Sequence, residues 1–243
     1  MIRIEEVEYI YPNGCKALDG ISLEIEKGEV VALMGENGAG KTTLMGLMAG
    51  VVVPTQGDVK IMGYDVLKEP EKAKSLISYS PQEGVVYEDL NAIENLSFFA
   101  GLYGLSGAET RKRIEELLEF VELKDVAKKR VKTYSGGMKR RLNLAAALIS
   151  DPEIILLDEP TTGLDPRIRR MIWDKIYELK KWGKTVVLAT HYMEEADELS
   201  DRVAIMDKGK VVALDEPEKL KQILGPTSVV KIEVAETVPG LEK

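Results

Sequence analysis

The sequence predicts an α/β fold whose core is a mainly parallel β-sheet. Runs of residues that are apolar, or apolar but for one threonine, occur at 30–34, 154–157 and 185–189, and such runs are typical of strands covered on both faces. Segments with helical patterns separate these runs. Strands that alternate with helices favour parallel pairing, because each helix returns the chain to the same edge of the sheet.

The N-terminal part of the chain begins with short strand-like runs at residues 2–7 and 21–25, before the buried strand 30–34. A glycine loop follows that strand and leads into a predicted helix over 43–50. Residues 59–62 and 76–79 predict two further strands.

The pattern becomes helical over residues 82–149. Asn91 with Glu94, and Ser106 with Glu109, have the spacing of a capping box and predict two helix starts. A stripe at i, i+3, i+4 and i+7 predicts a helix face turned to the core rather than a binding surface. Its members are Ile114, Leu117, Leu118 and Val121.

The C-terminal part predicts a helix over 171–181 and a hairpin formed by 202–206 and 210–214. Residues 227–234 begin another strand-like pattern shortly before the chain ends. We expect residues 226–243 to be either a short tail or the start of a truncated C-terminal extension.

The composition restricts the class of partner. Lys and Arg number 33 against 41 Asp and Glu, for a net charge of −8, which lacks the basic footprint of a nucleic-acid-binding protein. A single cysteine, Cys15, excludes an internal disulfide and fits a reducing compartment. No apolar run is long enough to span a bilayer, and the start does not resemble a signal peptide. We therefore expect a chain kept in the cytosol.

A phosphate-binding loop is predicted between the strand 30–34 and the helix that follows. Gly35 to Thr42 fits the pattern G-x-x-x-x-G-K-[ST], in which backbone N–H groups converge on phosphate oxygens. Lys41 is expected to reach the β- and γ-phosphates of ATP, and the Thr42 hydroxyl to bind Mg²⁺. The residues expected to contact the nucleotide here are Gly35, Glu36, Asn37, Gly38, Ala39, Gly40, Lys41, Thr42 and Thr43.

Two acidic residues end the buried strand 154–157 and lie at the sheet edge where α/β proteins bind ligands. Asp158 suits Mg²⁺, and Glu159 is then placed to act as a general base on an attacking water. Alone, two such acids often only solvate a strand end. Beside a phosphate loop they indicate hydrolysis.

A second glycine turn, Tyr134 to Lys139, opens the helical run that ends at residue 149. Ser135, Gly136 and Gly137 offer a hydroxyl, free N–H groups and a helix N-terminus, as an anion site does. Alone, Ser-Gly-Gly indicates only a flexible helix start, but the first two motifs favour a second phosphate site.

These three motifs together resemble an ABC-type nucleotide-binding domain, over Ile2 to about Leu224. The resemblance implies a P-loop NTPase core, an N-terminal antiparallel β-subdomain and an inserted α-helical subdomain at about 83–149, within a domain of residues 1–225. Ser135–Gly137 resembles the family signature, which closes over the γ-phosphate of ATP held by the second subunit. The preceding Tyr134 stands where Leu is commoner.

The same resemblance assigns further site residues. Tyr11 resembles the aromatic residue that stacks on adenine, and Gln82 the glutamine that touches Mg²⁺ and the attacking water. Thr162 to Asp165 resembles the loop that crosses the dimer interface. His191, the single histidine, matches the switch histidine that contacts the γ-phosphate.

Residues 132–141 and 190–197 are similar to the separate-chain ATPases of drug-export systems of the daunorubicin-resistance kind. This implies an ATP-hydrolysing subunit that works as a head-to-tail dimer with a distinct integral membrane permease, at the cytoplasmic face of the membrane. Export is the expected direction, and Tyr87 or a close neighbour is expected to contact the permease. Phe98, Phe99 and Tyr103 lie in the same segment, where core packing explains them equally well.

Three alternatives remain at this stage. The chain could be an ABC ATPase that acts without a transporter on ribosomes or DNA, but it holds one such domain and no sustained heptads. It could sense ATP without hydrolysing it, which Glu159 argues against. A GTPase is disfavoured because no N-K-x-D motif is present.

Overall fold

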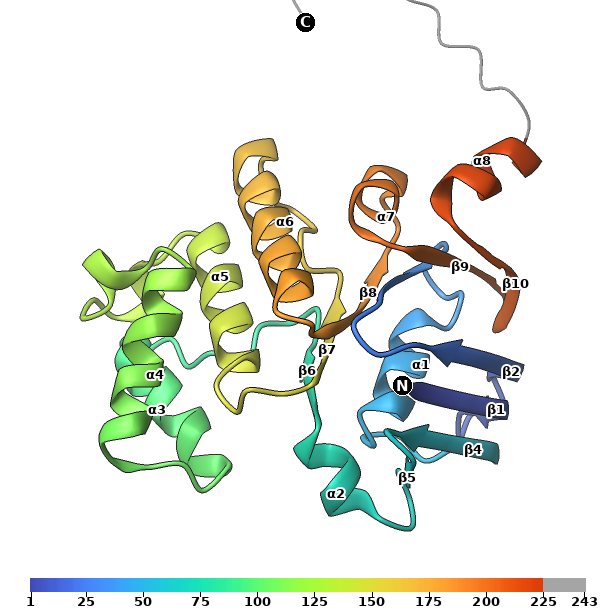
Figure 1. Ribbon diagram of the computed structural model, residues 1–243, viewed down its shortest axis with the longest axis horizontal. Coiled ribbons are helices and arrows are strands. Elements are labelled where there is room, and N and C mark those ends of the chain that lie inside the picture. Colours follow the sequence, from blue (N-terminus) through green and yellow to red (C-terminus); the bar gives the residue numbers. More distant parts are fainter. Residues whose placement is uncertain (225–243) are drawn as a thin grey trace, which may run out of the picture.

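The computed structural model describes residues 1–224 and places their strands in two sheets (Figure 1). The strand-like pattern predicted at 227–234 lies outside the described residues. One sheet has four strands in the order β2-β1-β4-β5, and its pairs are antiparallel. Its strands are β1 (Ile2–Ile10), β2 (Lys16–Ile25), β4 (Gln56–Ile61) and β5 (Tyr64–Asp65).

The second sheet has six strands in the order β10-β9-β3-β8-β7-β6. All its pairs are parallel except β9 with β10, so the predicted parallel sheet and terminal hairpin are both confirmed. Its strands are β3 (Val30–Met34), β6 (Ile77–Ser80), β7 (Ile154–Asp158), β8 (Thr185–Thr190), β9 (Arg202–Asp207) and β10 (Lys210–Asp215).

Both faces of the six-stranded sheet are buried, as the apolar runs predict. In β3, Val30 and Ala32 face one core cluster, which is shared with the helices α3 to α8. Val31 and Leu33 point the other way, into a cluster shared with the four-stranded sheet and α1. Side chains alternate between the faces of a strand, so one short run joins two cores. The α-helices are α1 (Lys41–Met48), α2 (Pro70–Ser75), α3 (Ala92–Leu102), α4 (Gly107–Phe120), α5 (Gly136–Ala147), α6 (Pro166–Lys181), α7 (Met193–Leu199) and α8 (Pro217–Leu224).

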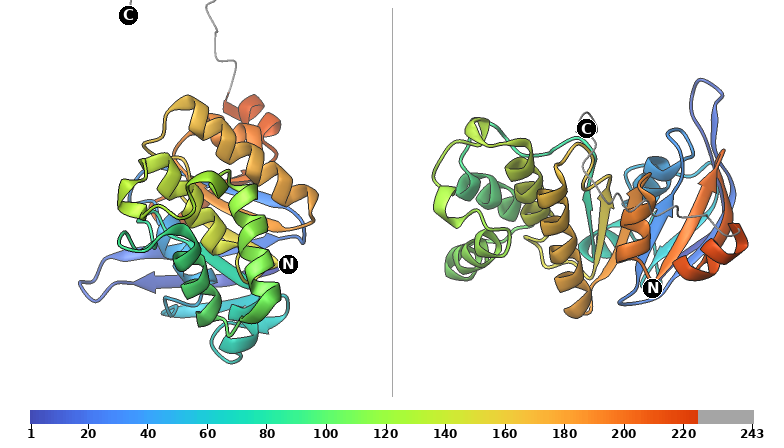
Figure 2. Two further views of the ribbon diagram at one scale, coloured as in Figure 1. Left: turned by 90° about the vertical axis from the view of Figure 1, so that its left-hand side faces the viewer. Right: turned by 90° about the horizontal axis from the view of Figure 1, so that it is seen from above.

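The helices α3, α4 and α5 follow β6 and precede β7 in the sequence, and they pack on one another. Figure 2 shows α3 and α4 at the opposite end of the molecule from the four-stranded sheet. The capping box predicted at Asn91 and Glu94 is confirmed by both of its hydrogen bonds. The box predicted at Ser106 is wrong: its side chain accepts no capping hydrogen bond, because Gly107 directly after it turns to a φ of +90°.

The helix α6 (Pro166–Lys181) contains the predicted helical range 171–181 and begins one turn before it, at Pro166. The carboxylate of Asp165 accepts a hydrogen bond from the Ile168 N–H at 3.0 Å, and proline suits the first helical position. The apolar periodicity that we used for the prediction begins one turn after these capping signals.

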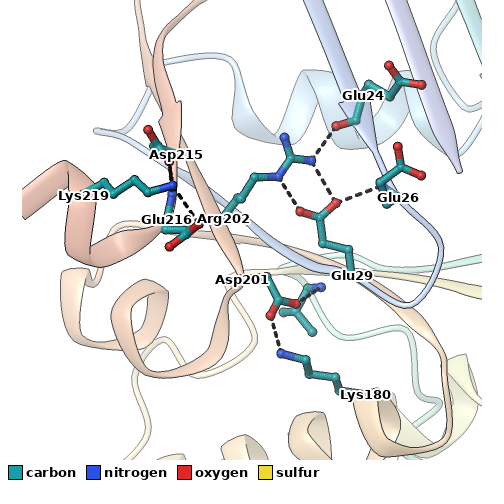
Figure 3. Close-up of polar contacts among 10 residues, drawn as sticks. Glu24, Glu26, Glu29, Lys180, Asp201, Arg202, Asp215, Glu216 and Lys219 are labelled. Carbon is teal, nitrogen blue, oxygen red and sulfur yellow. Dashed lines mark hydrogen bonds and ion pairs between the residues drawn. The ribbon is translucent and has the colours of Figure 1, made fainter.

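Arg202 connects β9 to the turn that precedes β3 through an ion pair with Glu29, which we call the arginine clamp (Figure 3). The Arg202 guanidinium donates to both carboxylate oxygens of Glu29, at 2.5 and 2.9 Å, and to the Glu24 carbonyl at 2.8 Å. Asp201 next to it accepts from the Val30 N–H at 2.9 Å and from Lys180 at 2.5 Å. These contacts hold the N-terminal end of β3, the strand that leads into the glycine loop.

Candidate active site

The glycine loop between β3 and α1 is fitted closely to two other strands. A Cβ on Gly35 would lie 2.3 Å from the Met206 carbonyl oxygen, and one on Gly40 would lie 2.7 Å from the Ala17 carbonyl oxygen. Gly40 also has a φ of +104°, a conformation that favours glycine. Glycine at these two positions therefore allows β2 and β9 to pack directly against the loop.

Lys41 begins α1 and is buried under the loop. Its Nζ donates to the carbonyl oxygens of Gly35 at 2.7 Å and Glu36 at 3.1 Å. Glu36, Asn37 and Gly38 at the tip are exposed to solvent, while Ala39 and Gly40 are buried. The loop thus offers backbone to solvent above a buried ammonium group.

Asp158 ends β7 and is 1% exposed. The Tyr79 hydroxyl donates to its Oδ2 at 3.3 Å. Its Oδ1 is buried and has no hydrogen-bond partner within residues 1–224. Burial raises the pKa of the Asp158 carboxyl, and the nearby Thr42 and Tyr79 hydroxyls offset this rise in part. Oxygen ligands and an unpartnered buried carboxylate oxygen fit a hard cation such as Mg²⁺.

Glu159 is the next residue and has its backbone in the left-handed region, at φ +49°. Its Oε2 lies 2.8 Å from Nδ1 of His191 and accepts a hydrogen bond from the Thr162 hydroxyl at 2.7 Å. The Lys41 ammonium lies 3.8 Å from Oε1. The structure therefore brings together a carboxylate, an imidazole and a lysine that are far apart in the sequence.

Tyr11 lies at the turn between β1 and β2, and its hydroxyl is 2.9 Å from the Thr43 hydroxyl of α1. Its ring packs edge-on against Tyr9, with 4.9 Å between centroids, and the residue is 40% exposed. A partly exposed aromatic ring is therefore anchored beside the glycine loop.

The remaining predicted residues lie outside the contacts described so far. Gln82 follows β6 and is exposed, and Ser135 and Asp165 accept hydrogen bonds from the first turns of α5 and α6. Gly136 and Gly137 begin α5. Within residues 1–224, no hydrogen bond or ion pair links the Ser135 or Asp165 side chain to the glycine loop.

Four residues in or beside this site were not singled out individually from the sequence. Tyr79 binds Asp158, and Thr162, predicted only as part of an interface loop, binds Glu159. Arg140 donates to two backbone carbonyls at the site, and Glu195 on α7 is completely buried. Only Tyr79 had a usable signal, because it ends a strand at the same sheet edge.

Residues 18–162 match the ABC transporter family. The chain is 41% identical over 236 residues to the linearmycin resistance ATP-binding protein LnrL of Bacillus subtilis, which covers 97% of this chain and 75% of that protein. It is 44% identical over 210 residues to the daunorubicin resistance ATP-binding protein DrrA3 of Streptomyces coeruleorubidus, which covers 86% and 66% respectively. The dimeric, post-hydrolysis structure of the ATP-binding cassette MJ0796 bound to ADP and Pi matches with a TM-score of 0.81 and 29% identity, covering 89% of this chain and 99% of that one.

The chain belongs to the ABC transporter family, as an ATP-binding domain of the ABC ATPase fold. The resemblance to ATPases of the daunorubicin-resistance kind is confirmed by the identity to DrrA3. The chain spans about two thirds of the length of DrrA3 and three quarters of LnrL. The relatives named above give no support to an ATPase that acts without a transporter. Among the helices within residues 1–224, none is both long and apolar enough to cross a membrane.

Proposed function

We propose that this chain binds and hydrolyses ATP as the motor subunit of an ABC exporter, paired with a separate integral membrane permease. The observation that carries the proposal is the Glu159 carboxylate, which lies 2.8 Å from His191 and within one residue of a carboxylate suited to a cation. A protein that only senses ATP has no use for a base at this position.

The chemistry in one chain follows from these contacts. ATP binds with its phosphates on the loop from Gly35 to Thr43 and its adenine against Tyr11. The Lys41 ammonium then exchanges its hydrogen bonds to the loop carbonyls for hydrogen bonds to the phosphate oxygens. Glu159 accepts a proton from water, whose oxygen attacks the γ-phosphorus as the bond to ADP breaks. His191 holds the carboxylate and contacts the γ-phosphate.

Magnesium is part of the same proposal. Thr42, Asp158 and Gln82 would hold Mg²⁺, which would neutralise negative charge on the phosphate oxygens. The unpartnered Oδ1 of Asp158 supports the fit, because a cation offsets the cost of burying that oxygen.

A second copy of the chain completes each site. Ser135, Gly136 and Gly137 would close over the γ-phosphate held by the other copy, and Asp165 would lie at the interface between them. The helix dipole and free N–H groups at the start of α5 suit that anion. Release of phosphate then removes the ligand that both copies share, and the dimer opens.

The permease would dock on the segment that follows Gln82, at the cytoplasmic face of the membrane. Tyr87 and Phe98 are 50% and 41% exposed and pack edge to face, with 4.9 Å between ring centroids. Buried Asn95 holds the backbone of Tyr87 on both sides, at 2.7 and 3.0 Å. We assign residues 83–149 to a helical subdomain that presents this surface within a nucleotide-binding domain of residues 1–225. Replacing Tyr87 and Phe98 by Ser should abolish association with the permease and leave ATP turnover of the isolated chain unchanged. Intact association and transport would refute this docking site.

Measurement of phosphate release from Mg-ATP tests the catalytic proposal. The wild-type chain should release phosphate, and Glu159→Gln should lose at least about a hundredfold in rate while it still binds ATP. Glu153→Gln, a partly exposed carboxylate directly before the opposite end of the same strand, is the matched control. Equal loss in both variants, or none in Glu159→Gln, would exclude Glu159 as the base.

A further inference from the structure

Arg140 on α5 links two segments of the active site through their backbones. Its Nη1 donates to the Gln82 carbonyl at 2.9 Å, and its Nη2 donates to the Glu159 carbonyl at 2.5 Å. These acceptors are 58 and 19 residues away in the sequence. One guanidinium therefore connects the segment after β6 to the end of β7. A lysine, whose ammonium is a single point charge, lacks this fork of donors.

The Glu159 backbone needs such support. Its φ of +49° is uncommon for a residue with a side chain, and a conformation of this kind persists only where its surroundings hold it. The Glu159 N–H donates to the Ala189 carbonyl of β8 at 2.9 Å. Arg140 holds the other side of the residue, at its carbonyl. Without the guanidinium, the carbonyl loses the one side-chain donor that it has within residues 1–224.

The guanidinium also lies among the acidic groups of the site. Burial lowers the pKa of Arg140, and the charges of Asp158, Glu159 and Glu195 offset this effect. Burying a charged group is favourable only where such charges and hydrogen bonds compensate it. Arg140 thus belongs electrostatically to the catalytic edge of the sheet, although it lies on a helix outside it.

The same helix begins at the second glycine turn. α5 runs from Gly136 to Ala147, and Ser135 caps its first turn. Helices are stiff over such lengths, so a movement of the start of α5 carries Arg140 with it. We propose that Arg140 is a positioning residue that couples the two ATP sites of the dimer: closure of Ser135–Gly137 on ATP in one site sets the Glu159 backbone in the other. This proposal rests on the shared-site dimer of the proposed function.

The test compares Arg140→Gln, Arg140→Lys and wild type by ATP turnover as a function of ATP concentration. In Arg140→Gln, kcat should fall about ten- to a hundredfold, because a misplacement of the base by about 1 Å has an effect of that size. The Kd for ATP should stay unchanged, since Arg140 does not contact the nucleotide loop. The Hill coefficient should fall from near the limit of about two, set by two sites, toward one. Arg140→Lys, which can reach one carbonyl only, should recover part of kcat and none of the cooperativity.

Arg113→Gln is the matched control. Arg113 on α4 donates to the Leu148 carbonyl at 3.1 Å, also within the helical part of the chain, and touches no catalytic residue. It should keep the wild-type kcat and Hill coefficient, and thermal unfolding of both variants shows whether either loses structure.

The possible outcomes separate the two proposals. A wild-type chain that hydrolyses ATP cooperatively, with Arg140→Gln indistinguishable from it, overturns the role of Arg140 and leaves the proposed function standing. Loss of thermal stability in Arg140→Gln with unchanged kcat and Hill coefficient also overturns it, in favour of a structural role. A wild-type chain without ATP turnover overturns the proposed function and the coupling together.

Discussion

Nδ1 of His191 lies 2.8 Å from Oε2 of Glu159, across the gap between the ends of β8 and β7. The Thr162 hydroxyl donates to the same carboxylate oxygen at 2.7 Å. Two groups therefore hold Oε2, while Oε1 lies 3.8 Å from the Lys41 ammonium. Replacing this group by an amide keeps its shape and removes its basicity.

Glu159→Gln should therefore trap the ATP-bound dimer. The amide preserves the size of the side chain, so the site closes on ATP, but it cannot accept the proton of water. Light scattering with and without Mg-ATP should show a mass that doubles only when ATP is present. Adding Ser135→Arg to the same variant should abolish the doubling if the glycine turn of one copy binds the phosphate held by the other.

A mass that stays monomeric while ATP still binds would contradict closure of the isolated chain. Repeating the measurement with the permease present then distinguishes a dimer that needs its membrane partner from a wrong assignment of the second glycine turn.

The sequence predicted the parts of this site that depend on local order. A buried strand followed by a glycine loop, and another followed by two acids, place Lys41, Asp158 and Glu159 at one sheet edge by topology alone. The contact of Arg140 could not be predicted in this way, because its acceptors are backbone carbonyls and carry no side-chain signal. The short helices α2 and α7 were missed because they span too few turns to show a periodicity.

Glu195 on α7 lies behind the site with a completely buried carboxyl group. Its Oε1 accepts hydrogen bonds from the Thr161 hydroxyl at 2.8 Å and the Trp173 indole at 3.1 Å, while Oε2 has no hydrogen-bond partner in the part of the chain that the structure describes. Burial raises the pKa of this carboxyl above 4.5, and the nearby charge of Glu159 adds to the rise. The folded chain therefore keeps the Glu195 carboxyl neutral up to a higher pH than the unfolded chain does.

The contribution of Glu195 to the free energy of unfolding should consequently fall as the pH rises. Above pH 4.5 the unfolded chain loses the proton that the folded chain keeps, so the free energy of unfolding falls by about 1.4 kcal/mol per pH unit until the folded pKa is reached. Glu195→Gln removes this term. Its free energy of unfolding, relative to wild type, should increase between pH 4 and pH 8 in urea titrations. Glu194→Gln, an exposed neighbour, should show no such trend, and a flat difference for Glu195→Gln would contradict a neutral acid.

The arginine clamp of Figure 3 should matter more for stability than exposed ion pairs of the same type. Arg202 binds the Glu29 carboxylate with two hydrogen bonds, and the Glu29 side chain is 11% exposed. Arg202→Met leaves that carboxylate with one donor among residues 1–224, the Glu26 N–H. We expect a loss of about 1–3 kcal/mol in the free energy of unfolding, measured by chemical denaturation.

Arg3→Met is the control for that measurement. Arg3 binds Glu24 at 3.0 Å, but both side chains are nearly half exposed, so the pair should contribute about 0–1 kcal/mol. Equal losses in Arg202→Met and Arg3→Met would show that partial burial of Glu29 has no effect on the strength of the clamp.

Tyr11 carries two separable interactions, a ring beside the glycine loop and a hydroxyl 2.9 Å from that of Thr43. If the ring stacks on adenine, Tyr11→Ala should weaken ATP binding by about 1–3 kcal/mol, because base stacking on an aromatic ring is of that size. Tyr11→Phe keeps the ring and loses only the hydrogen bond between hydroxyls, so the Kd for ATP should rise by less than about tenfold. Because stacking recognises the face of any base, GTP should bind the wild-type chain with a similar Kd and lose affinity in Tyr11→Ala to the same extent. Equal loss in the Phe and Ala variants would assign the effect to the hydroxyl, and the ring would then serve the turn between β1 and β2 rather than the nucleotide.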